Sequence, residues 1–175
     1  MKKFFSIALF SLSLLVATQS FGQYQKGDKL LNAGIGLSSY YGGGLPIGGS
    51  LEFGVTDQIS AGVSFDFATW GYNFGGYRWR YTFLYPGVRG SYHVNELLNL
   101  NNDKLDLYGG LFLGYVISSY SDNSGFSGSY YNPYGSTVRL GAHIGGRYYF
   151  NNNVGGFAEL GYGVSALKVG VAFKF

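Results

Sequence analysis

The chain has 175 residues, with 30 Gly, 17 Tyr, 15 Phe, 3 Pro and no Cys. Its formal net charge of +3 falls to +1 once the two N-terminal lysines are removed with the segment described next, so the charge gives no case for nucleic-acid binding. The absence of Cys excludes a disulfide framework and a thiolate metal site, and with only two His residues we expect no metal or other cofactor.

Residues 1–22 have the organisation of a secretory signal peptide. Lys2 and Lys3 form a basic start, Phe4 to Ala17 form a short apolar stretch, and Ser20-Phe21-Gly22 supplies the small residues of a cleavage site. The apolar stretch is too short to span a membrane. Removing 22 of the 175 residues leaves 153, which suffice for one exported domain over residues 23–175.

Eight segments of the mature chain alternate apolar residues with small or polar ones, which is the period of a β-strand. In the third segment, Val63, Phe65 and Phe67 alternate with Ser64 and Asp66. No apolar run in the mature chain approaches the roughly 20 residues that a spanning helix needs. The segments cover roughly residues 29–40, 45–55, 59–69, 78–93, 104–119, 136–150, 154–165 and 167–175.

The fourth segment changes phase at Pro86. Trp79, Tyr81, Phe83 and Tyr85 share one face, whereas the apolar residues that follow Pro86 fall on the other. Proline cannot donate a hydrogen bond to the sheet and is tolerated at a bulge. We therefore predict one extra residue near Pro86, which would keep the whole apolar face on the same side of the strand.

The apolar faces carry no charged residue in the middle of any segment, and the opposite faces are small or polar. This is the reverse of a water-soluble barrel, and a charge facing lipid at mid-membrane costs about 2–4 kcal/mol. The sequence therefore predicts an all-β protein, namely an eight-stranded antiparallel up-and-down transmembrane β-barrel with an apolar exterior and a polar lumen. An even number of strands places both ends of the chain on one side, which export makes the periplasm.

Ionic residues fall on the inward faces of these strands. Charges of opposite sign in a narrow bore should pair, because an unpaired buried charge is costly. We expect Glu159 to pair with Lys168 on the next strand and with Arg139 or Arg147 on the previous one, and the network to plug the lumen. Asp106 and Lys174 share the inward face with the predicted lumen network, which comprises Glu52, Asp66, Arg89, Arg139, His143, Arg147, Glu159 and Lys168.

Four connections are expected to face outside. They are Tyr40–Gly44, Trp70–Tyr77, Tyr120–Gly135, which is the longest, and a tight turn near Ser165-Ala166. The longest one is rich in Tyr, Ser, Gly and Asn, which make adaptable contacts in recognition loops. It could contact an extracellular protein or glycan, and the alternative is a solvated loop without a partner. The candidate contact residues are Tyr120, Phe126, Tyr130, Tyr131 and Tyr134.

The chain ends on an apolar strand with the pattern Lys168-x-Gly170-x-x-Phe173-x-Phe175. This pattern resembles the C-terminal signal by which outer-membrane β-barrels are recognised for assembly. With the signal peptide, the amphipathic strands and the abundance of Gly and Tyr, the chain resembles the small outer-membrane β-barrel family of Gram-negative bacteria. The resemblance implies location in the cell outer membrane and contact with outer-membrane lipid and, during biogenesis, with the barrel-assembly machinery. We expect the protein to be a monomer. The resemblance leaves activity open.

The favoured function is a structural or surface-interaction role without catalysis. A narrow porin-like channel for ions or small solutes stays open as an alternative. A lipid-modifying enzyme is a second alternative, because His143 and Glu159 fall on adjacent predicted strands and Ser is plentiful, although both are predicted to point away from lipid. A third is a soluble periplasmic barrel that binds an apolar ligand, against which the outward apolar faces argue.

Overall fold

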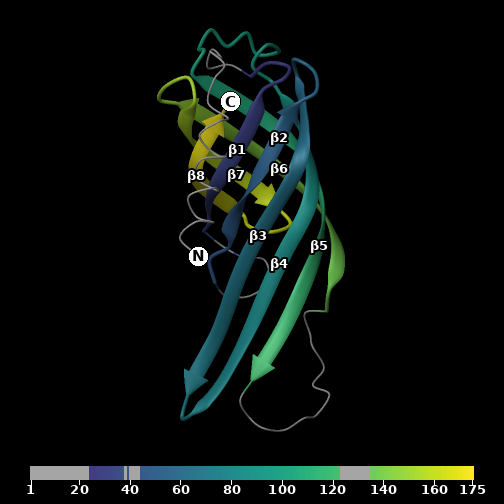
Figure 1. Cartoon of the computed structure of the whole chain (residues 1–175), viewed down its shortest axis with the longest axis vertical. Coiled ribbons are helices and arrows are strands. Elements are labelled where there is room, and N and C mark those ends of the chain that lie inside the picture. The colour runs from purple at the N-terminus through teal and green to yellow at the C-terminus, as the bar shows by residue number, and fades with distance from the viewer. Residues whose placement is uncertain (1–23, 38, 40–43, 123–134) are drawn as a thin grey trace, which may run out of the picture.

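A computed structural model describes residues 24–37, 39, 44–122 and 135–175, so the predicted signal peptide lies outside the described residues. Each strand pairs with the next and the last with the first, which forms a closed antiparallel barrel and confirms the predicted fold (Figure 1). No helix in the described part of the chain is long and apolar enough to cross a membrane. The strands are β1 (Lys29–Gly36), β2 (Ile47–Gly54), β3 (Ile59–Phe74), β4 (Tyr77–His93), β5 (Leu105–Asp122), β6 (Thr137–Tyr149), β7 (Val154–Tyr162) and β8 (Leu167–Lys174).

The barrel closes where β1 pairs with β8. The register runs from Leu30 opposite Lys174 to Gly36 opposite Lys168. Lys29 and Phe175 extend this ladder by exchanging two backbone hydrogen bonds of 2.8 and 3.1 Å. Closure gives each of the eight strands a neighbour on both sides within the barrel wall, and it brings the start of β1 and the end of β8 together at what we call the terminal end.

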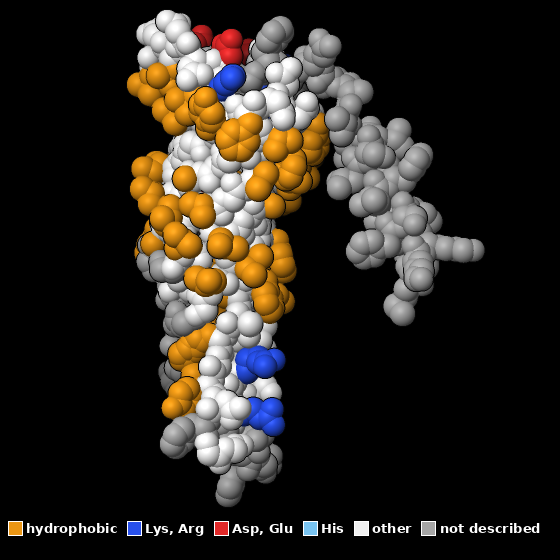
Figure 2. All heavy atoms as spheres, turned by 90° about the vertical axis from the view of Figure 1, so that its left-hand side faces the viewer, with side chains coloured by type: hydrophobic (Ala, Val, Ile, Leu, Met, Phe, Trp, Pro, Cys, Tyr) orange, Lys and Arg blue, Asp and Glu red, His pale blue; other side chains and the backbone are white. Residues whose placement is uncertain are grey.

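The outer wall of the barrel is apolar. Val63, Leu140 and Ile144 are 54%, 65% and 63% exposed, although they sit in the middle of their strands. Glu52 and Arg147, which point inward, are fully buried. Figure 2 shows many apolar side chains over the visible face of the wall, and we call this zone the apolar belt. The orientation predicted from the alternation is therefore present, with apolar side chains outside and ionic side chains inside.

Strands β3, β4 and β5 are 16, 17 and 18 residues long and project beyond the others at the end opposite the termini (Figure 1). We call this projection the arm and define it as residues 69–82 and 119–122. The predicted loop from Trp70 to Tyr77 was wrong, because pairing continues to Phe74 opposite Tyr77. Gly75 and Gly76 make the turn with φ of 58° and 87°, values that favour glycine and suit a two-residue hairpin.

The predicted bulge near Pro86 was also wrong. Pro86 lies opposite Phe65 in an unbroken register between β3 and β4. On its other side β4 pairs with β5, where Leu84 lies opposite Ile117 and Gly87 opposite Gly114. Both strands advance by three residues between these pairs, so neither contains an extra residue. The change of apolar phase in the sequence thus marks a change in what the lumen contains, with no change in the backbone.

The lumen accordingly has two layers. Toward the terminal end it is mainly polar, as predicted, beside a small buried cluster of Tyr149, Phe157 and Ala172, whereas toward the arm it is apolar and aromatic. Phe83 and Tyr85, which were expected to face lipid, are each 1% exposed and pack inside the barrel with Ala68 and Val116. Tyr81 packs against the same cluster. The side chains that fill the arm side of the bore are apolar because they pack against one another. An apolar residue in the sequence therefore does not by itself indicate the lipid face.

The orientation of the wall predicts how arginine is tolerated along β6. Ile144→Arg places a charge at the middle of the apolar belt and should lower the free energy of unfolding in lipid vesicles by about 2–4 kcal/mol, whereas Phe150→Arg, at the terminal end of the same face, should lower it by about 0–1 kcal/mol. Urea titrations followed by tryptophan fluorescence measure both. Equal losses for the two variants would contradict the assigned membrane position.

Candidate functional site

The carboxylate of Glu52 on β2 lies at the centre of the polar layer. Its Oε2 accepts hydrogen bonds from Ser60 Oγ (2.9 Å) and Ser91 Oγ (2.6 Å). Its Oε1 lies 3.2 Å from Arg147 Nη2 and 3.2 Å from Arg89 Nε. Because Glu52 is fully buried, these four contacts replace the water that the charge would otherwise bind.

Arg147 on β6 contacts three other strands, of which β5 is its neighbour in the sheet and β1 and β2 lie across the bore. Its Nε donates to Asn32 Oδ1 on β1 (3.0 Å), and its Nη1 donates to Asp106 Oδ2 on β5 (2.8 Å). Its Nη2 donates to Glu52 on β2, and its guanidinium carbon lies 4.0 Å from the centre of the Tyr108 ring. A fully buried guanidinium with a partner for each nitrogen and a ring against its face ties the inner wall together.

A second arginine links two further strands. Arg89 on β4 makes a bidentate ion pair with Glu159 on β7, with Nη2 to Oε2 at 2.8 Å and Nη1 to Oε1 at 3.3 Å. Tyr108 donates to the same carboxylate at 3.2 Å. Since Arg89 also contacts Glu52, the two arginines and their carboxylates form one continuous cluster, which we call the lumen network.

Both histidines join this network through serines. His93 contacts Ser60 Oγ with Nε2 (2.9 Å) and Asp106 Oδ1 with Nδ1 (2.7 Å). His143 contacts Ser91 Oγ with Nε2 (3.0 Å). Each serine has one hydroxyl hydrogen, and if that hydrogen goes to Glu52 then the histidine nitrogen must donate to the serine oxygen. The order Ser60, His93, Asp106 is that of a nucleophile, a base and a carboxylate, but Ser60 is fully buried and also bonds Glu52.

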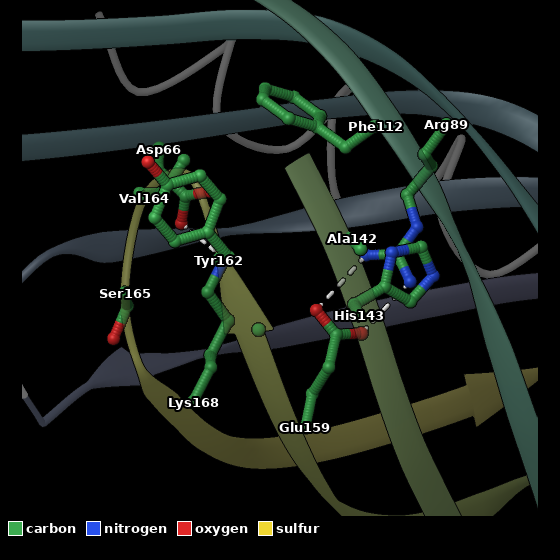
Figure 3. A pocket seen from close by; sticks show the side chains of 11 residues that line it. Asp66, Arg89, Phe112, Ala142, His143, Glu159, Tyr162, Val164, Ser165 and Lys168 are labelled. Carbon is green, nitrogen blue, oxygen red and sulfur yellow. Dashed lines mark hydrogen bonds and ion pairs between the residues drawn. The ribbon is translucent and has the colours of Figure 1, made fainter. Parts of the chain in front are cut away.

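A small cavity lies beside the lumen network on the side of the short strands. Lys168 pairs with Asp66 at its edge, and Arg89 and Glu159 lie across from them (Figure 3). The cavity is about 40 Å³, which holds a few water molecules at most. Among the described residues, no group of three or more His, Asp or Glu is placed to hold a metal ion.

Tyr24 covers the lumen network at the terminal end. Its ring stacks on that of His93, with centroids 3.5 Å apart and planes at 5°. Its hydroxyl donates to the backbone carbonyls of Thr56 and Ile59. Burial and the negative charge of Asp28 raise the pKa of Tyr24 above its ordinary value, so the hydroxyl keeps the proton that it donates. The segment just before β1 thus packs over this end of the lumen network.

Solved structures with this architecture are membrane proteins. The N-terminal β-barrel domain of OprF from Pseudomonas aeruginosa matches 86% of this chain and 98% of its own, with 17% identity and a TM-score of 0.53. The fold is that of a small outer-membrane β-barrel. Ail, the attachment invasion locus protein of Yersinia pestis, solved in complex with the heparin analogue sucrose octasulfate, matches 86% of this chain and 100% of its own, with 16% identity and a TM-score of 0.53.

A designed transmembrane β-barrel is similar to the same extent, with 17% identity, 86% of this chain and 98% of its own covered, and a TM-score of 0.50. No protein-family model and no curated protein sequence matches the chain. Identities this low show the barrel fold and carry no activity across.

Within the outer-membrane barrel fold, most ionic residues named from the sequence lie in the bore, but their partners differ from those expected. Glu159 lies opposite Lys168 in the register, yet it pairs with Arg89 across the bore, and Lys168 pairs with Asp66. Arg139 sits nearer the arm and takes no part in the ion pairs described above. His143 contacts a serine and not a carboxylate.

The structure places the residues of the predicted C-terminal signal at the end of the chain and describes one of the five candidate loop residues. Lys168 and Gly170 face inward on β8, and Phe173 and Phe175 are partly buried on the outer side near the terminal end. Tyr120 was expected in a loop but belongs to β5, where its ring lies 4.8 Å from that of Tyr81. The other four candidate contact residues lie outside the described residues, namely Phe126, Tyr130, Tyr131 and Tyr134.

Sequence reasoning missed several members of the lumen network. Ser60, Ser91 and Asn32 carry no charge, so nothing marked them among the many polar residues on inward faces. His93 was recognisable, since it follows Arg89 and Ser91 at every second position of β4. Tyr24 gave no signal, because it precedes the first strand and its partner is 69 residues away.

The central position of Glu52 predicts a large effect of removing its charge. Glu52→Gln leaves Arg89 and Arg147 facing an uncharged buried group and should lower the free energy of unfolding in vesicles by about 3–5 kcal/mol. Asp103→Asn, an exposed carboxylate between β4 and β5, should change it by less than about 0.5 kcal/mol. If Glu52→Gln unfolds at the same urea concentration as the wild type, the network does not stabilise the barrel.

Proposed function

We propose that this protein is an exported structural or surface-interaction barrel of a Gram-negative outer membrane, with a lumen closed by its paired charges. The terminal end would face the periplasm and the arm would face outward. The observation that carries the proposal is the path of Arg147, a fully buried side chain on β6 that bonds β1 and β2 across the bore and Asp106 on the neighbouring β5. A bore crossed by such a side chain is suited to holding the wall together and unsuited to passing solutes.

Two further observations support closure of the bore. The layer of Phe83, Tyr85, Ala68 and Val116 fills the lumen on the arm side of the lumen network. Tyr24 covers the network from the other side. A narrow channel, the alternative, would require all three of these obstacles to move, because they lie one behind another along the bore.

The arm supports the surface-interaction part of the proposal. It carries paired strands well beyond the apolar belt, so it presents a rigid surface that loops alone would not. The partner would be an extracellular protein or glycan. A glycan is consistent with the sulfated sugar bound by Ail, whose barrel has the same fold.

Catalysis is not part of the proposal. Ser60, His93 and Asp106 have the order of a hydrolytic triad, but Ser60 is fully buried and its hydroxyl faces Glu52. A nucleophile needs an open side from which a substrate carbonyl can approach, and an acyl chain outside the wall cannot reach this oxygen. The arrangement therefore fits a structural hydrogen-bond chain.

Planar-bilayer recordings of the mature protein test closure. The wild type should give a flat current trace at high voltage in concentrated KCl. Arg147→Ala combined with Tyr85→Ala removes one inward side chain from each lumen layer and should produce leak currents. Leu140→Ala combined with Val88→Ala, on the lipid face, should stay flat. Discrete conductance steps from the wild type would overturn the closed lumen in favour of the channel.

A further inference from the structure

The outer wall of the barrel carries few charges, and they share one sign. Among the charged strand residues whose side chains the structure describes, three occupy outward positions in the alternation, namely Lys29, Arg78 and Arg80. All three are cations. Lys29 lies at the terminal end, and the two arginines lie at every second position of β4 in the arm. Cations are therefore confined to the two margins of the apolar belt.

The transition from the belt to the arm occurs over a few rows of paired residues. Phe67 opposite Leu84 is the last apolar outward row on β3 and β4, and Thr69 with Thr82 follows on the same face. Gly71 opposite Arg80 comes next. Four residues from Leu84 to Arg80, at about 3.4 Å each and tilted by about 40°, place Arg80 about 10 Å beyond the last apolar side chain along the barrel axis. A long arginine at this level reaches the headgroup layer.

A shallow groove opens on the arm around these arginines. Gly71 has no side chain, so the wall is low directly beside Arg80. The groove residues at outward positions all offer hydrogen-bond donors except this glycine, and none of the residues lining the groove is acidic. Figure 2 shows two groups of Lys or Arg side chains on the pale surface beyond the apolar belt. The outward residues are Thr69, Gly71, Asn73, Arg78, Arg80 and Ser121.

We propose that this groove binds the anionic phosphate groups of outer-leaflet lipid headgroups, with Arg78 and Arg80 as the principal contacts. Guanidinium groups donate pairs of hydrogen bonds that match phosphate oxygens, and Thr, Asn and Ser supply neutral donors around them. Trp70, Tyr72 and Trp79 line the groove from the inward face of the arm, but Arg78 and Arg80 lie on the face that is continuous with the lipid-exposed belt, so lipid is the neighbour that the fold brings to them. This contact would fix the height and tilt of the arm relative to the membrane.

Native mass spectrometry of the mature, detergent-solubilised protein tests the proposal. The protein is mixed with equal amounts of phosphatidylglycerol, which is anionic, and phosphatidylcholine, which is not. The wild type should retain the anionic lipid at least about fivefold more than the zwitterionic one, which corresponds to about 1 kcal/mol at 1.4 kcal/mol per tenfold. Arg78→Gln with Arg80→Gln should reduce the preference below about twofold, and so should high salt.

A matched variant controls for charge alone. Lys26→Gln with Lys104→Gln removes two exposed cations at the terminal end and should keep the wild-type preference. Folding of every variant is checked by the heat-dependent shift in gel migration that folded barrels show. An unchanged preference in the double arginine variant would overturn the proposal. A second result would also overturn it. If soluble sucrose octasulfate bound in an arginine-dependent way without displacing any lipid, the groove would be assigned to an extracellular glycan.

Discussion

The pairing of β1 with β8 is the contact on which the remaining features depend. Hydrocarbon offers no hydrogen-bond partner, so a sheet that enters it must satisfy its own backbone, and only closure does this for every strand. Closure in turn separates two environments along each strand. Outward positions meet lipid and become apolar, whereas inward positions meet only one another. The composition of the two faces follows from closure and not from any single residue.

A closed eight-stranded bore is narrow enough for side chains to meet across it. That geometry explains why Arg147, besides pairing with Asp106 on the neighbouring β5, can bond β1 and β2, and why Arg89 joins β4 to both β2 and β7. In a wider barrel the same residues would face water. The aromatic layer on the arm side of the lumen network fills the same bore by contact between rings. Ionic and aromatic side chains therefore fill the same bore at two levels.

The sequence predicted the strands and their lipid faces well, because alternation has a period of two and lipid admits no charge. It failed where apolar side chains pack inside the bore, as Phe83 and Tyr85 do. Assigning these two residues to the lipid face led to the incorrect prediction of a bulge at Pro86. Ion-pair partners were also beyond its reach. Residues opposite each other on adjacent strands can be predicted from the sequence. Arg89 and Glu159, however, meet across the bore, and which residues meet there depends on the stagger and tilt of the closed sheet. The sequence did not predict the length of the arm, because its pattern placed Gly75 and Gly76 in a loop, whereas they form a two-residue turn between paired strands.

The central claim is that even-numbered positions of β6 face lipid and odd-numbered positions face the bore. The chain has no Cys, so single cysteines at each position from 138 to 147 can carry a spin label without further changes. In lipid vesicles, accessibility to oxygen should alternate with a period of two, high at positions 138, 140, 142, 144 and 146 and low at those between. High accessibility at 143 and 147 with low accessibility at 140 and 144 would contradict the account, and so would a flat profile.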